Sequence, residues 1–263
     1  MSAIDLSRYD AYLFDLDGTI YAGSRLLPGA KEAISLLRSR NKQIMMVTNT
    51  SVYTRHDCRQ RLRHMGIELS LDQVITAAYM AGLYFRERYP DAVVYIIGEE
   101  ALTKEIVGLD IRTTDDPYEA THLLVGMDRR FDYGKLYLGM KAVRNGASLV
   151  ATNADPYCPV FQDIIPDTWG IAKAIESAAA GRIAAVTGKP EKFYVQKTLE
   201  HLNVPAHRCL MTGDRLETDI MLGINGGMGT ALVLTGVTGI DDLTGCEIRP
   251  DYVFADLKEM FAV

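Results

Sequence analysis

Short apolar segments alternate with helical patterns along the first third of the chain. Residues 11–16 and 43–48 are apolar runs of the length of a buried strand. Between them, residues 30–37 carry apolar side chains at helical spacing after a Pro-Gly break. A second helical pattern spans residues 54–65 and stops at Gly66. This alternation predicts an α/β fold in which helices cover both faces of a parallel sheet.

The alternation continues through a middle segment and then returns to the first pattern. We expect further strands at residues 74–77, 93–97, 123–126, 148–151, 208–212, 230–234 and 252–254. We expect further helices at residues 80–89, 101–107, 133–144, 171–180, 192–202 and 217–224. The economical topology is a doubly wound, Rossmann-like core of residues 1–78 and 185–263, split by a smaller inserted α/β domain of residues 79–184.

Composition and charge argue against several classes of function. The chain has 263 residues and a net charge of −6, whereas nucleic acids and anionic membranes are bound by basic patches. Its hydrophobic content of 48% is ordinary for a globular protein, and no apolar run approaches the ~18 residues of a membrane span. The cysteines are far apart, at Cys58, Cys158, Cys209 and Cys246, which predicts reduced thiols in a cytoplasmic protein.

An acidic pair follows the first predicted strand. In the sequence DLDGT, Asp15 and Asp17 stand two positions apart, and Gly18 allows the backbone to turn sharply beside them. One carboxylate can attack phosphorus to form an acyl phosphate, and the other can protonate the leaving oxygen. The alternative interpretation is an acidic turn that only caps the strand.

Three further polar signals lie at predicted strand ends or just before helices. Thr48 and Asn49 end the second strand, where hydroxyl and N–H groups suit phosphate oxygens. Lys189, in a Gly-Lys-Pro sequence before a helix, can neutralise charge on a transferring phosphoryl group. Asp214 follows a strand, and Asp219 comes five residues later. Each signal alone also fits a turn, a helix cap or a solvated surface residue.

The acidic residues together also suit a magnesium ion, which prefers oxygen ligands and keeps several waters. Asp15, Asp214 and the backbone carbonyl of Asp17 would supply the protein ligands. Asp219 would orient Lys189 or a metal-bound water. Four carboxylates and one lysine would repel a phosphate dianion, so we expect Mg²⁺ as the cofactor.

The four motifs DLDGT, VTN, GKP and GDRLETD resemble, in order, those of the haloacid dehalogenase-like superfamily of phosphotransferases. The resemblance extends over the whole chain. It implies that Asp15 is the nucleophile and Asp17 the general acid and base. It also implies that Thr48 and Lys189 bind phosphate, and that magnesium is held by Asp15, Asp17 and Asp214.

The spacing of the motifs is similar to one branch of this superfamily. Only 30 residues separate Asp17 from Thr48, whereas 139 separate Asn49 from Lys189, which is the position of a C2-type cap. The stretch GASLVATNADPYCP (residues 146–159) resembles the cap motif of the nitrophenylphosphatase or NagD-like branch. Members of this branch often form homodimers, which makes a homodimer an expectation from the resemblance.

Three residues near predicted loops of the cap are candidates for substrate contact: Asp155, Tyr157 and Trp169. We expect the inserted domain to act as a lid that excludes bulk water, with these residues supplying specificity. The alternative is that they only pack the cap. Trp169 stands where the branch usually has small residues, so the resemblance does not carry over specificity.

We therefore predict a magnesium-dependent phosphatase that hydrolyses small phosphorylated metabolites, such as sugar phosphates or nucleotides, through an aspartyl-phosphate. Nitrophenyl phosphate would serve as a surrogate substrate. A dehalogenase of the same fold would need neither Asp17 nor Asp214. A phosphomutase would return the phosphoryl group to its substrate, and a non-catalytic protein would bind a phosphorylated metabolite without turnover. A signalling receiver domain would be much shorter.

Overall fold

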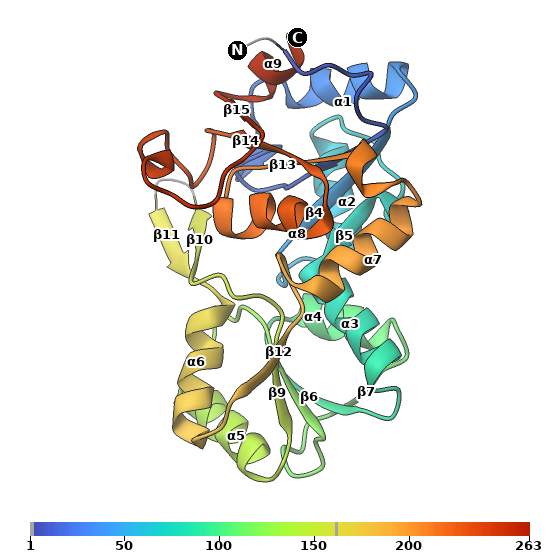
Figure 1. The fold of residues 1–263 in the computed structure, drawn as a ribbon. Helices are drawn as coiled ribbons and strands as arrows, with labels where there is room; N and C mark the ends of the chain where they lie inside the picture. Colours follow the sequence, from blue (N-terminus) through green and yellow to red (C-terminus); the bar gives the residue numbers. More distant parts are fainter. Residues whose placement is uncertain (1–2, 161–162) are drawn as a thin grey trace.

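Two parallel sheets, one above the other in Figure 1, form the framework of the computed structural model, which describes residues 3–160 and 163–263. The larger sheet has the strand order β15–β14–β13–β1–β4–β5, and its neighbouring strands are all parallel. Its strands are β1 (Ala11–Phe14), β4 (Gln43–Thr48), β5 (Val74–Thr76), β13 (Cys209–Gly213), β14 (Gly229–Val233) and β15 (Tyr252–Phe254). Strand β1 therefore lies near the middle, between β13 and β4.

Alternation of side chains along β1 explains why helices cover both faces of this sheet. Tyr12 and Phe14 belong to one apolar cluster, while Ala11 and Leu13 point to the opposite face and belong to another. Residues of α1 (Ala30–Ser39), α2 (Arg55–His64) and α9 (Leu257–Phe261) fill the first cluster. Residues of α3 (Ala77–Arg88), α7 (Lys192–Leu202) and α8 (Met221–Gly226) contribute to the second. The predicted doubly wound α/β class is confirmed.

The smaller sheet has five parallel strands in the order β12–β9–β8–β6–β7. They are β6 (Val93–Ile97), β7 (Arg112–Thr114), β8 (His122–Val125), β9 (Ser148–Ala151) and β12 (Ile183–Val186). One face packs against α5 (Tyr133–Arg144) and α6 (Thr168–Ala179), and the other against α3 and α4 (Glu100–Val107). This sheet too is a layered α/β unit with its own apolar core.

Helix α3 links the two sheets. It contributes Met80 to a core cluster of the larger sheet and Phe85 to a core cluster of the smaller one. The predicted domain boundary after residue 78 falls in the first turn of α3, and the boundary after residue 184 falls within β12. The division into core and inserted domain at these residues stays a prediction.

Two antiparallel hairpins and several short turns complete the described chain. The hairpins are β2 (Tyr21–Ala22) with β3 (Arg25–Leu26), and β10 (Tyr157–Val160) with β11 (Asp163–Pro166). Short 3₁₀ turns occupy Leu71–Gln73, Ala206–Arg208 and Asp241–Leu243, and a π-helical turn occupies Leu216–Ile220. In Figure 1, β10 and β11 lie between the two sheets. None of the helices in the described ranges is long and apolar enough to cross a membrane.

Candidate active site

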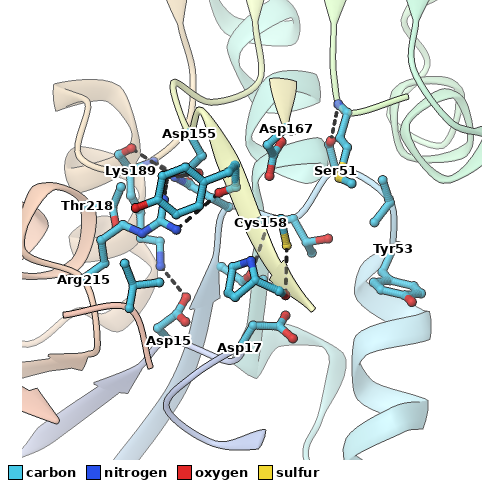
Figure 2. A pocket seen from close by; sticks show the side chains of 18 of the residues that line it. Asp15, Asp17, Ser51, Tyr53, Asp155, Cys158, Asp167, Lys189, Arg215 and Thr218 are labelled. Carbon is cyan, nitrogen blue, oxygen red and sulfur yellow. Dashed lines mark hydrogen bonds and ion pairs between the residues drawn. The ribbon is translucent and has the colours of Figure 1, made fainter. Parts of the chain in front are cut away.

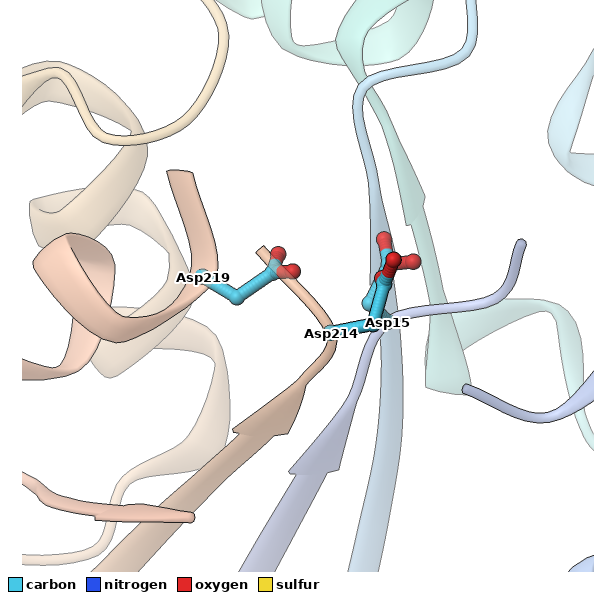
Figure 3. Close-up of side chains that lie close together, drawn as sticks. All are labelled: Asp15, Asp214 and Asp219. Carbon is cyan, nitrogen blue, oxygen red and sulfur yellow. The ribbon is translucent and has the colours of Figure 1, made fainter. Parts of the chain in front are cut away.

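Three neighbouring strands of the larger sheet end at one place. Strands β13, β1 and β4 are adjacent and parallel, and Asp214, Asp15 and Thr48 lie at or directly after their carboxyl ends. Their side chains converge, because the carboxyl ends of parallel strands share one edge of a sheet. Figure 3 shows Asp15 and Asp214 following neighbouring strands, with the Asp219 carboxyl group directed toward them. The motif residues that the sequence singled out thus meet in space.

The buried Lys189 side chain ties two of these acidic residues together. Its ammonium nitrogen lies 2.6 Å from Asp15 Oδ1 and 2.6 Å from Asp219 Oδ1, and it donates to the Val47 carbonyl at 2.9 Å. Burial alone would lower the pKa of Lys189, but the charges of Asp15 and Asp219 outweigh it and raise that pKa. Lys189 is therefore a fixed positive charge at the end of β1.

Three buried carboxyl groups form a set of oxygen ligands. One oxygen from each of Asp15, Asp214 and Asp219 lies within 4.8 Å of the others. Burial raises the pKa of Asp15 well above its usual value; the charge of Lys189 opposes this, and those of Asp219 and Asp214 add to it. Burial and the Asp219 charge also raise the pKa of Asp214 to about 7. A divalent cation that prefers oxygen ligands fits this set. Its charge would offset the repulsion among the three carboxylates, which the single charge of Lys189 only partly compensates.

The backbone closes tightly around Asp214. Its Oδ2 accepts a hydrogen bond from the Val237 amide at 2.7 Å. A Cβ atom at Gly18 would lie 2.6 Å from the same oxygen, and one at Gly236 would be closer still. Gly18 also has φ of +90°, a conformation that other residues rarely adopt. The two glycines therefore allow two loops to pack directly on this carboxyl group and fix its position.

Asp17 lines the same cavity as Asp15 but has a different environment (Figure 2). Burial raises the pKa of Asp17 to about 6, while the charge of Arg61 and a hydrogen bond with Tyr21 oppose the increase. Asp15 is hydrogen-bonded to Lys189 and clustered with other carboxyl groups, whereas the charged and hydrogen-bonding neighbours of Asp17 are Arg61 and Tyr21. Two carboxyl groups with such different surroundings suit the roles of nucleophile and proton donor.

Thr48 and Asn49 lie beside Asp15 but make different contacts. Thr48 is buried, lines the cavity, and its hydroxyl oxygen accepts a hydrogen bond from the Thr50 amide at 3.2 Å. The Asn49 side chain accepts from the Lys189 amide at 2.7 Å and donates to the Lys189 carbonyl at 3.2 Å. It also donates to Asp155 Oδ2 at 2.8 Å. Asn49 therefore holds the backbone of Lys189, in addition to lining the cavity where phosphate binding was predicted.

Two of the three candidate residues of the predicted cap reach this cavity. Asp155 is buried, and its Oδ1 pairs with Arg215 Nη1 at 2.8 Å. Arg215 also donates to the Tyr157 carbonyl at 3.3 Å, and its guanidinium carbon lies 5.1 Å from the centre of the Tyr157 ring. Figure 2 shows Asp155 and Arg215 on the same side of the pocket as Lys189. The ion pair thus joins the loop after β9 to the loop after β13.

Trp169 lies elsewhere. It is half-buried on the first turn of α6, its ring centre is 5.0 Å from the Lys173 ammonium nitrogen, and it is not among the cavity-lining residues of the described chain. Asp167, which caps α6, does line the cavity. The only tryptophan is therefore a less direct candidate for substrate contact than its neighbour two residues earlier.

The cavity has a volume of about 230 Å³ and is lined from both sheets. Four cationic side chains line it: Arg61, Arg129, Lys189 and Arg215. The sequence motifs pointed only to Lys189. Arg215 lies within the motif GDRLETD and could have been suspected from its place next to Asp214. The other two arginines carry no such local signal, because an arginine in a helix or loop is ordinarily a solvated surface residue.

A Rossmann-like sheet with an acidic cluster and a lysine at its carboxyl edge, facing a second α/β unit, is the arrangement of a capped phosphohydrolase. Family models agree: residues 12–112 match a haloacid dehalogenase-like hydrolase model, and residues 186–260 match a HAD-hydrolase-like model. The acid sugar phosphatase of Staphylococcus epidermidis is 35% identical over 257 residues, which cover 98% of each chain. The chain belongs to the haloacid dehalogenase-like hydrolase family.

Solved structures place the chain in the predicted branch. The crystal structure of 4-nitrophenylphosphatase from Thermotoga maritima has a TM-score of 0.92 at 31% identity and covers 98% of both chains. A structure described as a putative nagD protein has a TM-score of 0.84 at 31% identity and covers 93% of this chain and 96% of its own. The predicted family, its NagD-like branch and the predicted enzyme class are confirmed, and the chain is a phosphatase of this type.

Proposed function

We propose that this phosphatase hydrolyses small phosphate monoesters through an aspartyl-phosphate on Asp15, with Mg²⁺ as its cofactor. The observation that carries the proposal is that two neighbouring carboxyl groups, those of Asp15 and Asp17, have different charged and hydrogen-bonding neighbours. Asp15 contacts Lys189 at 2.6 Å and lies in a cluster with two other carboxyl groups. Asp17 instead has Arg61 and Tyr21 as its neighbours, and burial raises its pKa to about 6. Such a pair supports one carboxylate acting as nucleophile and the other as proton donor.

The reaction would proceed in two displacements at phosphorus. In the first, an Asp15 carboxylate oxygen bonds to phosphorus, the ester P–O bond breaks, and the Asp17 proton moves to the leaving oxygen. In the second, Asp17 takes a proton from water, the water oxygen bonds to phosphorus, and the bond from phosphorus to Asp15 breaks. The products are the alcohol and inorganic phosphate. Lys189 would stabilise negative charge that develops on the phosphoryl oxygens.

Asp15, Asp214 and the backbone carbonyl of Asp17 would hold the magnesium ion. Asp219 belongs to the same cluster of oxygen atoms, but its two oxygens already accept from Lys189 and from the Arg215 amide, so it would act through Lys189 or a bound water. Bound Mg²⁺ would offset the charge of the carboxylates and stabilise charge on the phosphoryl group. Support comes from the raised pKa values of Asp15 and Asp214, because a nucleophilic carboxylate must be ionised and a nearby cation lowers the pKa of a carboxyl group.

The substrate is proposed to be a small phosphorylated metabolite. Relatives named acid sugar phosphatase and 4-nitrophenylphosphatase support sugar phosphates as natural substrates and nitrophenyl phosphate as a surrogate. The smaller sheet and its loops would act as a lid, with Asp155 and Tyr157 held near the site by Asn49 and Arg215. A cytoplasmic location and a homodimer stay predictions.

Free phosphate release is the measurement that tests this proposal. With Mg²⁺ present, we expect phosphate to appear in step with loss of a phosphate ester, and exhaustive chelation to remove the activity until Mg²⁺ is returned. Full turnover in metal-free buffer would contradict the role of the cation. An isomerised ester without free phosphate would indicate a phosphomutase, and tight binding without turnover would indicate a non-catalytic protein.

The pH dependence of kcat/KM should report the proton on Asp17. Since the first displacement needs Asp17 protonated and its pKa lies at about 6, kcat/KM should fall as pH rises above about 6. The variant Asp17→Asn, which has no proton to give, should lose about 10²- to 10⁴-fold in activity and also lose this alkaline decline. A substrate with an acidic leaving group, such as nitrophenyl phosphate, should be less affected. An unchanged decline in Asp17→Asn would contradict the assignment.

A further inference from the structure

Arg61 differs from the other cations that line the active-site cavity. Lys189, Arg129 and Arg215 each pair with a carboxylate, at 2.6, 2.6 and 2.8 Å respectively. Among the residues that the structure describes, no acidic side chain lies within 4.0 Å of the Arg61 guanidinium group. Its guanidinium group is therefore not held in an ion pair, whereas the other three cations are already paired with carboxylates of the protein.

The Arg61 guanidinium group is nonetheless fixed in position. It lies against two tyrosine rings, with its central carbon 4.7 Å from the centre of the Tyr21 ring and 4.5 Å from that of Tyr53. It donates to the Gly23 carbonyl at 3.1 Å and to the Tyr21 hydroxyl at 3.4 Å. A guanidinium group has five N–H donors, so these bonds leave others for a ligand. A side chain held in this way loses little conformational freedom on binding an anion.

The position of Arg61 relative to the reacting groups decides which part of a substrate it would meet. Arg61 and Asp17 line the same cavity. The Arg61 guanidinium group donates to the hydroxyl of Tyr21, whose backbone forms a β-bridge with Asp17. Figure 2 shows Lys189 on one side of the pocket and Tyr53 on the other, with Asp17 between them. If Asp17 protonates the leaving oxygen, then the alcohol part of the substrate lies toward Arg61.

We propose that Arg61 is a specificity-determining residue that binds a second anionic group on the alcohol part of the substrate. This inference rests on the proposed function, and it names the substrate class as phosphate monoesters of small hydroxy acids or similar anionic alcohols. The cavity of about 230 Å³ is smaller than the ~300–1,000 Å³ typical of ligand pockets, so the two anions are separated by a few carbon atoms.

The test compares two substrates that differ only in the second anion, 3-phosphoglycerate and glycerol 3-phosphate. We expect the wild-type enzyme to have a kcat/KM about ten- to a hundredfold higher for the carboxylate substrate. In Arg61→Gln this ratio should fall to about one, and Arg61→Lys should retain part of it. Effects on Asp15, Asp17 or Lys189 cancel in the ratio, because both substrates use the same reacting groups.

Arg63→Gln is the matched control. Arg63 lies on the same helix, is largely exposed and pairs with Glu68 at 3.2 Å, so its replacement removes the same charge without altering the cavity. The control should keep the wild-type ratio. If the kcat/KM ratio falls equally in Arg61→Gln and Arg63→Gln, the effect is a long-range effect of charge. If the ratio is unchanged in Arg61→Gln, Arg61 only packs against its tyrosines. Either result overturns the proposal.

A wild-type measurement guards against variants that fail to fold. Against nitrophenyl phosphate turnover, glycerate should inhibit at about ten- to a hundredfold lower concentration than glycerol. Equal inhibition would overturn the role of Arg61. Turnover of nitrophenyl phosphate but of neither glycerol derivative would also overturn it, while leaving the phosphatase function intact. No turnover of any ester would instead refute the proposed function.

Discussion

Replacing Asp15 by asparagine should abolish phosphate release and leave the protein without any covalently bound phosphoryl group. The amide has nearly the shape of the carboxylate, but its oxygen is a poor nucleophile and carries no charge. Loss of a nucleophile costs several orders of magnitude, and we expect kcat to fall by about 10⁴-fold or more. Brief exposure of wild type to substrate, followed by acid quenching and intact mass measurement, should reveal an added phosphoryl group that Asp15→Asn lacks.

Asp10→Asn is a suitable control for the same change in charge. Asp10 directly precedes β1, is partly exposed, and pairs with Arg208 and Lys42 far from the cavity. This variant should retain turnover and labelling. Asp15→Asn should still fold, because Lys189 keeps its contacts with Asp219 and the Val47 carbonyl. A labelled Asp15→Asn protein would contradict the assignment of the nucleophile.

The buried parallel strands were the part of the fold that the sequence predicted well. The run at residues 43–48 coincides with β4, and the run at 208–212 is shifted by one residue from β13. Such strands are covered on both faces, so they appear as continuous apolar runs with helical patterns between them. Hydrophobic burial thus leaves a clear signal in the order of residues, and the fold class follows from it.

Elements with little burial left no such signal. The pattern did not predict the β2–β3 or β10–β11 hairpins, which have strands of two or four residues whose described positions, apart from the buried Tyr21, are exposed or half-exposed. It also described residues 217–224 as one helix, whereas a π-helical turn precedes α8 there. That turn places Asp219 against Lys189, and its geometry depends on tertiary contacts rather than on local preference.

The same reasoning explains which side chains of the site could be expected. Asp15, Thr48 and Asp214 lie at or just after the ends of predicted strands, and the carboxyl ends of parallel strands share one edge of a sheet, so their convergence could be predicted. The position of Arg61 depends on which face of α2 turns toward β2, and no local pattern carries that information. Helix α6 buries the side chains of Ile171 and Ile175, and the half-buried indole of Trp169 lies outside the cavity lining.

Replacing Lys189 by methionine should both destabilise the fold and reduce turnover. The ammonium group is buried with Asp15 and Asp219, so its removal leaves two carboxylates without their counter-charge. Breaking a buried pair costs about 3–5 kcal/mol in the free energy of unfolding. Loss of a charge that stabilises the phosphoryl oxygens should lower kcat by about 10²- to 10³-fold. Denaturant unfolding measures the effect on stability, and phosphate release measures the effect on turnover. The control is Lys104→Met, which removes a lysine from an exposed pair with Glu100 and should change neither quantity appreciably.

Adding Asp219→Asn to the Lys189→Met variant separates the two effects. The second substitution removes one of the uncompensated buried charges, so the double variant should unfold at a higher denaturant concentration than Lys189→Met alone. Turnover should stay low, because Asp219 cannot replace the lysine at the phosphoryl group. If the double variant is no more stable than the single one, Asp219 is not the acidic partner that Lys189 neutralises, and its place beside the ammonium group has another cause. If it regains stability without activity, the 2.6 Å contact between Lys189 and Asp219 compensates a buried charge, and the loss of turnover comes from the missing ammonium group itself.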